Sequence, residues 1–318
     1  MARERQIRGL PPVHGQLVRS KGVSAASAEK GRAIVLGGKT GLLGRPLCAA
    51  LLASGFAVSP TTRSELDPFD ADAVARAIEA FDATHLFNTV AYTAVDAAED
   101  DADAAYRLNR DLPGLLARTC DAAKVMFVHY STDFVFGGDA DKPYREEDPT
   151  DPRSVYGASK LAGEKAILEA GALKYQILRT AWLFGPGKKN FVDTILNLAR
   201  TREELKVVSD QVGSPTCTLD LAGWSADLAA TGKTGVFHAV GSGHASWCEL
   251  AAEAVIAAGI HCRVLPIPSS AYPQKAWRPR YSALSNAKLA EAIGRTPRPW
   301  VQSLREYVYS QAQAHTSD

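Results

Sequence analysis

A tyrosine and a lysine four residues apart carry the clearest chemical signal in this sequence. Tyr156 and Lys160 lie in the segment YGASK, where a helix would place both side chains on one face. An unperturbed phenol has a pKa of about 10 and keeps its proton at neutral pH. A nearby ammonium group favours the phenolate and would lower that pKa toward the working range. The pair predicts proton transfer to a carbonyl oxygen during hydride transfer, although such a spacing also arises on ordinary surface helices.

Three polar residues after an apolar run could complete such a site. Ser131, Thr132 and Asp133 follow the run VMFVHY, which predicts a buried strand over residues 125–131. Ligands bind at the carboxyl ends of strands in an open parallel sheet. A hydroxyl there could donate a hydrogen bond to a substrate carbonyl, and the spacing leaves both Ser131 and Thr132 open for that role.

A glycine-rich turn is the candidate site for a dinucleotide. It follows an apolar run over residues 32–36 and precedes a predicted helix over 42–54. Glycine permits the sharp turn and the close approach of a pyrophosphate, and the helix N-terminus offers free N–H groups. The residues expected to contact the cofactor here are Gly38, Lys39, Thr40, Gly41, Leu42, Leu43 and Gly44.

The end of the second predicted strand bears on the choice of cofactor. Dinucleotide folds that bind NAD often carry an acid there, but residues 59–63 read SPTTR and contain none. Arg63 could pair with a 2′-phosphate, so the sequence favours NADPH and leaves NADH open; a solvated surface arginine is the alternative. Asp67 or Asp70 could lie beside the adenine.

Strand and helix signals alternate along most of the chain, which is typical of a parallel sheet covered by helices on both faces. We therefore predict an α/β fold, a Rossmann-type doubly wound parallel sheet with a smaller, mixed C-terminal substrate-binding region. The dinucleotide-binding domain is expected over residues 31–185, with segments near 190–241 returning to it, and the substrate-binding region over 186–318. The expected strands are 32–36, 56–59, 85–91, 125–131, 175–184 and 236–241, and the expected helices 42–54, 70–81, 94–109, 112–123 and 155–170.

Composition excludes several classes of protein. The 318 residues are 46% hydrophobic and 22% charged, with a net charge of +1, so we expect no nucleic-acid partner, no membrane span and no disordered chain. Five scattered cysteines predict neither a disulfide framework nor a zinc site and suit the cytoplasm. Residues 1–30 carry six Lys/Arg and two acids and predict a disordered extension, with a transit peptide as the less favoured alternative.

Taken in order, several motifs resemble the dTDP-4-dehydrorhamnose reductase family of the extended short-chain dehydrogenase/reductase superfamily. They are GGKTGLLG, FNTVAYTAVDAAED, VHYSTDFVFGG, VYGASKLAGEKAIL, RTAWLFGPGKKNFVDTIL, DQVGSPT and RPRYSALSNAKL. The resemblance implies NAD(P)H-dependent reduction of the C4 ketone of dTDP-4-dehydro-L-rhamnose to dTDP-L-rhamnose. It implies Thr132 as the group that polarises the carbonyl, Tyr156 as proton donor, and Lys160 as its modulator and a ligand of the ribose.

The same resemblance implies further contacts in the site. Ala91 and Tyr92 would lie near the cofactor. Residues expected near the nucleotide sugar, besides the catalytic ones, are Asp133, Trp182 as a sugar-stacking ring, Asn190, Phe191 and Arg278. Without the resemblance, Trp182 would be read as a core residue. The proline-rich segment 266–279 is a candidate wall or lid of the cleft, or a rigid structural loop.

Two other functions stay open at this point. One is reduction of a different nucleotide-linked 4-keto sugar. The other is a non-catalytic NADP-binding subunit, such as the regulatory beta subunit of methionine adenosyltransferase, although the complete set of Thr132, Tyr156 and Lys160 disfavours it. Some family members bind Mg²⁺ and dimerise through it, but no such site can be mapped on this sequence. The expected state is a monomer or a homodimer.

Overall fold

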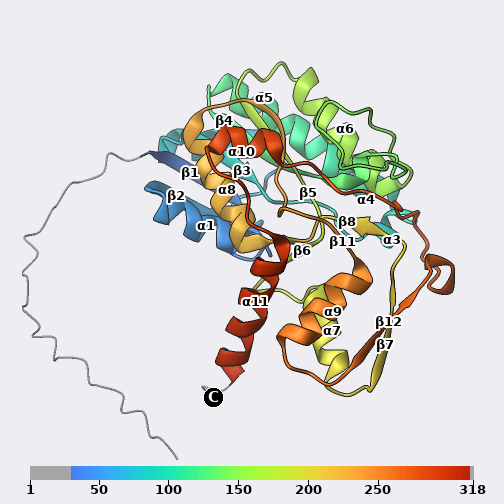
Figure 1. Cartoon of the computed structure of the whole chain (residues 1–318). Helices are drawn as coiled ribbons and strands as arrows, with labels where there is room; N and C mark the ends of the chain where they lie inside the picture. Colours follow the sequence, from blue (N-terminus) through green and yellow to red (C-terminus); the bar gives the residue numbers. More distant parts are fainter. Residues whose placement is uncertain (1–29, 316–318) are drawn as a thin grey trace, which may run out of the picture.

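A six-stranded parallel sheet forms the centre of the computed structural model, which describes residues 30–315 (Figure 1). Its strand order is β10-β5-β4-β3-β1-β2, and every neighbouring pair is parallel. The strands are β1 Gly31–Leu36, β2 Phe56–Thr61, β3 His85–Asn88, β4 Met126–Thr132, β5 Tyr175–Thr180 and β10 Gly235–His238. The extension predicted over residues 1–30 lies, except for Lys30, outside the described residues.

Helices cover both faces of this sheet. One face carries α1 (Gly44–Ala53), α8 (Thr218–Thr231) and α10 (Ala287–Ile293). The other carries α2 (Ala71–Phe81), α5 (Leu112–Ala122) and α6 (Val155–Glu169). Side chains alternate along the strands: Val35 packs into the first layer, while Ile34 and Leu36 pack into the second. The predicted doubly wound fold is confirmed.

The helix predicted over residues 94–109 is wrong in detail. The segment forms two short helices, α3 (Val95–Ala98) and α4 (Ala102–Tyr106), and then the π-helical turn η1 (Arg107–Asp111), which runs into α5. Asp101 restarts the helix, since its side chain accepts a hydrogen bond from Ala104 N at 3.1 Å. Pro113, in the first turn of α5, has no N–H to donate to the preceding turn, which favours the wider coil before it.

The strand predicted over residues 175–184 is also interrupted. β5 ends at Thr180, and the short strand β6 (Leu183–Phe184) leaves the main sheet to pair with β9 (Thr216–Cys217). Between them Trp182 has φ +48°, a left-handed conformation that few non-glycine residues adopt. The chain therefore turns at Trp182 and directs that side chain out of the line of the sheet.

A smaller layer is built from the later part of the chain and lies at the lower right of Figure 1. It contains α7 (Phe191–Ala199), α9 (Trp247–Ala257) and the parallel pair β7 (Glu204–Val208) and β12 (Arg263–Ile267). β8 (Val212–Gly213) and β11 (Ala245–Ser246) form an antiparallel pair, and η3 (Ser269–Ala271) follows β12. The strand predicted over 236–241 does lie in the main sheet, as β10; the proposed domain boundary at 185/186 stays a prediction.

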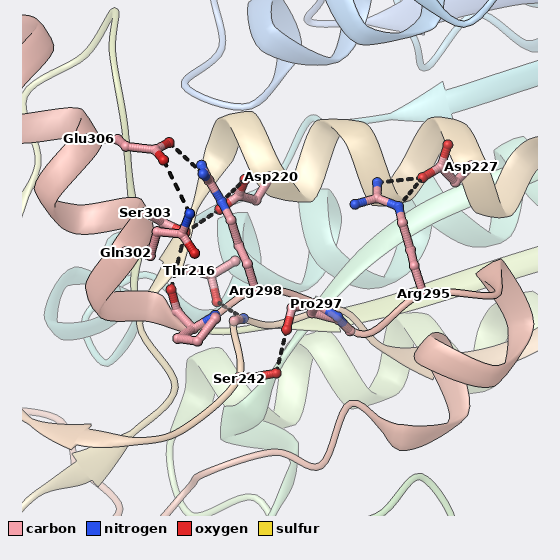
Figure 2. Close-up of polar contacts among 12 residues, drawn as sticks. Thr216, Asp220, Asp227, Ser242, Arg295, Pro297, Arg298, Gln302, Ser303 and Glu306 are labelled. Carbon is pink, nitrogen blue, oxygen red and sulfur yellow. Dashed lines mark hydrogen bonds and ion pairs between the residues drawn. The ribbon is translucent and has the colours of Figure 1, made fainter.

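The last helix, α11 (Trp300–His315), is fastened to α8 by charged groups (Figure 2). Arg298 Nε lies 2.8 Å from Asp220 Oδ1, and Ser303 Oγ donates to Asp220 Oδ2 at 2.5 Å. Arg298 also pairs with Glu306 on the helix itself. Because Asp220 is only 13% exposed, these contacts connect α11 firmly to the helix that covers the main sheet.

Candidate active site

The glycine turn after β1 forms a tight cradle at the N-terminus of α1. A Cβ at Gly44 would lie 2.2 Å from Gly37 O, and one at Gly38 would lie 2.9 Å from Val35 O. Gly37 has φ +78°, a conformation that favours glycine. Leu43, which precedes the helix, makes no side-chain cap; Arg45 N lies 3.5 Å from Gly41 O and Pro46 has no N–H, so only part of the first turn of α1 offers N–H groups to a ligand. The cradle fits a pyrophosphate, as predicted for a dinucleotide.

The residues after β2 contain a carboxylate that the sequence analysis missed. Arg63 is exposed, as the 2′-phosphate hypothesis requires. Two residues on, Glu65 accepts hydrogen bonds from Thr62 N at 2.8 Å and Thr62 Oγ1 at 3.0 Å, and pairs with Lys39 of the cradle. These hydrogen bonds, of which the one from Lys39 has the largest effect, lower the pKa of Glu65 to about 2. A cation–carboxylate pair thus borders the predicted ribose position.

The two acids considered for the adenine side have local structural roles. Asp70 is the N-cap of α2, where its Oδ1 accepts a hydrogen bond from Ala73 N at 2.9 Å. Asp67 is exposed and accepts one from Phe69 N at 3.1 Å. Both shape the loop between β2 and α2. A cofactor contact by Asp67 stays a prediction.

The loop with Ala91 and Tyr92 is held by Asn109, a residue that the sequence analysis did not single out. Asn109 Oδ1 accepts a hydrogen bond from Tyr92 N at 2.9 Å, and its Nδ2 donates to Tyr92 O at 3.1 Å. The same Nδ2 donates to Ser159 Oγ at 3.0 Å on α6. The π-helical turn carries Asn109 at 0% exposure, so it connects the predicted cofactor loop to the helix of Tyr156.

The structure distinguishes Ser131 from Thr132. Ser131 Oγ donates to Glu164 Oε1 at 2.5 Å, and both Glu164 oxygens accept hydrogen bonds from Arg179, at 2.9 and 2.7 Å. This buried network holds the Ser131 hydroxyl away from the site. The Thr132 hydroxyl instead lies close to the phenol of Tyr156, where it opposes the rise in the pKa of that phenol, and it donates to Asp133 Oδ1 at 3.0 Å. The geometry therefore supports Thr132 as the hydroxyl that would face a substrate carbonyl.

The predicted effect of Lys160 on Tyr156 stays a prediction, since the hydrogen bonds of Lys160 in the free protein go to other residues. Both side chains do lie on α6, but burial raises the pKa of Tyr156 to about 12. Lys160 Nζ donates to Tyr130 O at 2.6 Å and lies 3.2 Å from His129 Nε2. The contacts of Lys160 thus lie along β4. Burial lowers the pKa of Lys160 to about 8, although the nearby carboxylate of Glu164 opposes this shift. The phenol accordingly keeps its proton at neutral pH.

Asp133 contacts the hydroxyls of both Thr132 and Ser282. Its side chain is 2% exposed and accepts hydrogen bonds from Thr132 Oγ1 at 3.0 Å and from Ser282 Oγ at 2.5 Å. Burial raises the pKa of Asp133 to about 6, although these hydrogen bonds oppose the rise. Asp133 therefore orients Thr132, and Ser282 brings the C-terminal segment against the site.

That C-terminal segment also places Arg278. Arg278 Nη2 lies 2.9 Å from Asp96 Oδ2 on α3, and its guanidinium lies over Phe134 at 5.9 Å. Asp96 Oδ1 accepts a hydrogen bond from Ala276 N at 2.9 Å. Arg278 Nη1 is buried and has no hydrogen-bond partner among the described residues. The end of the predicted wall over 266–279 thus packs beside η2 (Asp133–Val135), and substrate contact by Arg278 stays a prediction.

Trp182 is stacked on a second tryptophan. Its ring lies 3.5 Å from that of Trp247, with 5° between the planes, and Phe191 lies against Trp247 at 4.6 Å. A Cβ at Gly213 would come within 2.4 Å of Trp182 Cε2. One face of Trp182 is therefore already covered, and only its remaining face or edge could meet a sugar. Trp247 is a member of this aromatic wall that the sequence analysis missed.

Asn190 has a structural role in this protein. It caps α7, its Oδ1 accepting a hydrogen bond from Asp193 N at 3.3 Å in a reciprocal capping box. Its Nδ2 donates to Gly185 O and to Tyr307 Oη, both at 3.0 Å. These bonds use the side-chain amide within the fold, so substrate contact by Asn190 or Phe191 stays a prediction.

Over residues 30–315, no three His, Cys, Asp or Glu side chains gather in a way that could hold a metal ion. In the same part of the chain, every helix is too short or too polar to cross a bilayer.

A family model described as RmlD substrate binding domain matches residues 32–313. The chain belongs to this family. The dTDP-4-dehydrorhamnose reductase of Burkholderia thailandensis is 40% identical, and the alignment covers 82% of this chain and 93% of that protein. The dTDP-4-keto-6-deoxy-D-glucose reductase of Streptomyces niveus is 37% identical, with 85% and 94% covered. The resemblance drawn from the motifs is confirmed at the level of the family.

Among solved structures, the dTDP-4-dehydrorhamnose reductase of Bacillus anthracis in complex with NADP has a TM-score of 0.83 to this chain. It is 32% identical, and the match covers 88% of this chain and 99% of that one. The structural agreement extends over both the sheet and the smaller layer.

Proposed function

We propose that this protein reduces the C4 ketone of dTDP-4-dehydro-L-rhamnose to dTDP-L-rhamnose with NADPH, and that NADH is a poorer donor. The observation that carries the proposal is that the Thr132 hydroxyl and the Tyr156 phenol lie close together at the carboxyl end of β4. Two such donors can converge on one carbonyl oxygen. Relatives that share the family and most of the chain length are named as reductases of dTDP-linked sugars.

The cradle after β1 supports the cofactor assignment. Gly38, Gly41 and Gly44 leave room for the pyrophosphate beside the uncapped start of α1. In this proposal the exposed Arg63 pairs with the 2′-phosphate, and the pair of Lys39 and Glu65 lies beside the ribose. The nicotinamide cofactor, when bound, supplies the hydride. The NADP complex of the Bacillus anthracis relative supports this choice.

Proton transfer falls to Tyr156 in this proposal. Its phenol is neutral in the free protein because burial raises its pKa, so a proton is ready for the C4 oxygen. Thr132 would donate a second hydrogen bond to the same oxygen as negative charge develops there, once its hydroxyl proton turns away from Asp133 Oδ1, which accepts it in the free protein. Lys160, one turn further along α6, supplies the positive charge that favours the phenolate left behind.

The second candidate is reduction of another nucleotide-linked 4-keto sugar. This candidate remains because the Streptomyces niveus relative is named as a reductase of dTDP-4-keto-6-deoxy-D-glucose. The two candidates share the reaction and differ in the sugar that meets Trp182 and Arg278. A non-catalytic subunit is disfavoured, because Thr132, Tyr156 and Lys160 are all present, with Thr132 and Lys160 buried and Tyr156 half-buried.

The test is oxidation of NADPH after addition of dTDP-4-dehydro-L-rhamnose, with dTDP-4-keto-6-deoxy-D-glucose in parallel. Tyr156→Phe should lower turnover by at least about a hundredfold, the usual scale of a general acid, and leave NADPH affinity nearly unchanged. Tyr175→Phe, on β5 and outside the site, is the matched control and should keep wild-type turnover. Undiminished turnover in Tyr156→Phe would refute the assigned proton donor.

A further inference from the structure

Two buried polar side chains that the proposed mechanism does not use lie in line with Lys160. Asn88 ends β3, and His129 is its register partner on β4. His129 Nδ1 lies 3.2 Å from Asn88 Nδ2, and His129 Nε2 lies 3.2 Å from Lys160 Nζ. Asn88 and His129 are each 1% exposed, and Lys160 is 2% exposed. The three groups must therefore satisfy one another's hydrogen bonds.

The backbone fixes the direction of this chain of hydrogen bonds. Asn88 Oδ1 accepts the N–H of Val90 at 3.1 Å, which leaves the amide nitrogen facing His129. An amide nitrogen only donates, so His129 Nδ1 must accept. Burial lowers the pKa of His129 well below its ordinary value, and a charged Lys160 would lower it further, so its ring is neutral whichever form Lys160 takes. A neutral ring that accepts at Nδ1 carries its proton at Nε2.

The Nε2–H proton of His129 points toward Lys160 Nζ. An ammonium group has three donors and no acceptor, whereas a neutral amine has a lone pair that can accept the His129 Nε2–H. Lys160 Nζ still donates to Tyr130 O at 2.6 Å in either form. The charged group nearest to Lys160 on its own helix is Glu164, which opposes loss of the charge but is already paired with Arg179 from β5.

We propose that Asn88 and His129 are positioning residues that favour the neutral form of Lys160 in the free protein, by presenting the Nε2–H of His129 to its amine. The inference deepens the proposed function, since Lys160 is the assigned modulator of Tyr156. The desolvation that lowers the pKa of Lys160 to about 8 acts in the same direction. With a pKa of about 8 the amine still carries most of its charge at pH 7, and that charge is favoured further once the amine turns away from His129.

Reversing the donor–acceptor direction of the hydrogen bonds between Asn88, His129 and Lys160 tests this inference. In Asn88→Asp the new carboxylate still accepts from Val90 N, and it also accepts from His129 Nδ1, so Nε2 becomes an acceptor for an ammonium. The ionisation of Lys160 is followed in the free protein by NMR of lysines labelled at Cε, with Lys160→Arg to identify the signal. We expect the pKa of Lys160 to rise by about one pH unit or more, a tenfold change in the equilibrium.

Asn286→Asp is the matched control. The Asn286 amide donates to Val240 O at 3.0 Å, so this variant also places a carboxylate at a partly buried amide position, but away from Lys160. It should leave the pKa of Lys160 as in the wild type. An unchanged pKa of Lys160 in folded Asn88→Asp would overturn the inference.

A second variant covers the case in which Asn88→Asp does not fold. In His129→Gln the amide can present its oxygen to the ammonium, so the pKa of Lys160 should rise again, and a fall or no change overturns the inference. Because the titration needs neither cofactor nor substrate, it is independent of the reductase assay. An inactive protein whose Lys160 responds as expected would refute the proposed function and leave this inference standing.

Discussion

Replacing Asp133 by asparagine should stabilise the protein at neutral pH. Asp133 is 2% exposed, and its oxygens accept hydrogen bonds only from the neutral hydroxyls of Thr132 and Ser282 and from nearby backbone N–H groups. Burial without a cation partner raises its pKa from an ordinary 3.8 to about 6. The ionised carboxylate is therefore a cost to the folded state that an isosteric, uncharged amide removes.

The size and pH dependence of the effect follow from the pKa. Because the folded state binds the proton more tightly, the contribution of Asp133 is most favourable below about pH 4 and is lost as the pH rises through about 6. The two pKa values differ by roughly two pH units, which corresponds to about 3 kcal/mol. Since the unfolded carboxyl is already partly ionised at pH 4, Asp133→Asn should raise the free energy of unfolding by about 2 kcal/mol more at pH 7 than at pH 4.

Urea denaturation of both proteins at several pH values between 4 and 7 measures this difference. Asp103→Asn, at an exposed acid on α4, is the control and should follow the wild-type pH dependence. Turnover of Asp133→Asn should fall while NADPH affinity stays the same, since the carboxylate orients Thr132. If the stability difference between Asp133→Asn and wild type is the same at pH 4 and pH 7, the reasoning from burial is wrong.

Two further predictions concern the cofactor. Arg63→Ala should weaken NADPH binding about tenfold in calorimetry and leave NADH binding unchanged, because only NADPH carries the 2′-phosphate that a guanidinium binds; an equal loss for both would count against this role. Gly44→Ala should abolish binding of both cofactors while the circular dichroism spectrum stays native, because the new Cβ lies 2.2 Å from Gly37 O; wild-type affinity would show that the cradle is not the phosphate site.

Much of the framework could be predicted from the sequence because the signals are local. Apolar runs separated by glycines predicted β1, β4 and β10, and the spacing of Val74 and Ile78 predicted α2. The cradle was predictable because three glycines at one strand–helix junction indicate a turn too tight for side chains, where a Cβ would collide with neighbouring backbone atoms. The spacing of Tyr156 and Lys160 predicted that α6 would carry both.

The errors arose where distant residues decide the local structure. The turn at Trp182 is favoured by its stack on Trp247, which is 65 residues away in the sequence, and β-propensity alone predicted a continuous strand. The direction of Lys160 depends on Tyr130 and His129 of another strand. Asn190, by contrast, had a readable signal: an asparagine followed three residues later by an acid is a capping box, which predicts a structural role.

The shifted pKa values of the site act together. Burial favours the neutral form of Tyr156, of Asp133 and of Lys160, with pKa values near 12, 6 and 8. The fully ionised buried pair, Glu164 and Arg179, is held to one side by its own hydrogen bonds. At pH 7, however, a carboxyl with a pKa near 6 and an amine with a pKa near 8 both still carry most of their charge. A hydrogen bond donated to a carbonyl oxygen beside Thr132 and Tyr156 would be stronger in this buried setting than in water, but the Asp133 carboxylate would oppose negative charge there. Protonation of Asp133, which burial favours, would remove that opposition.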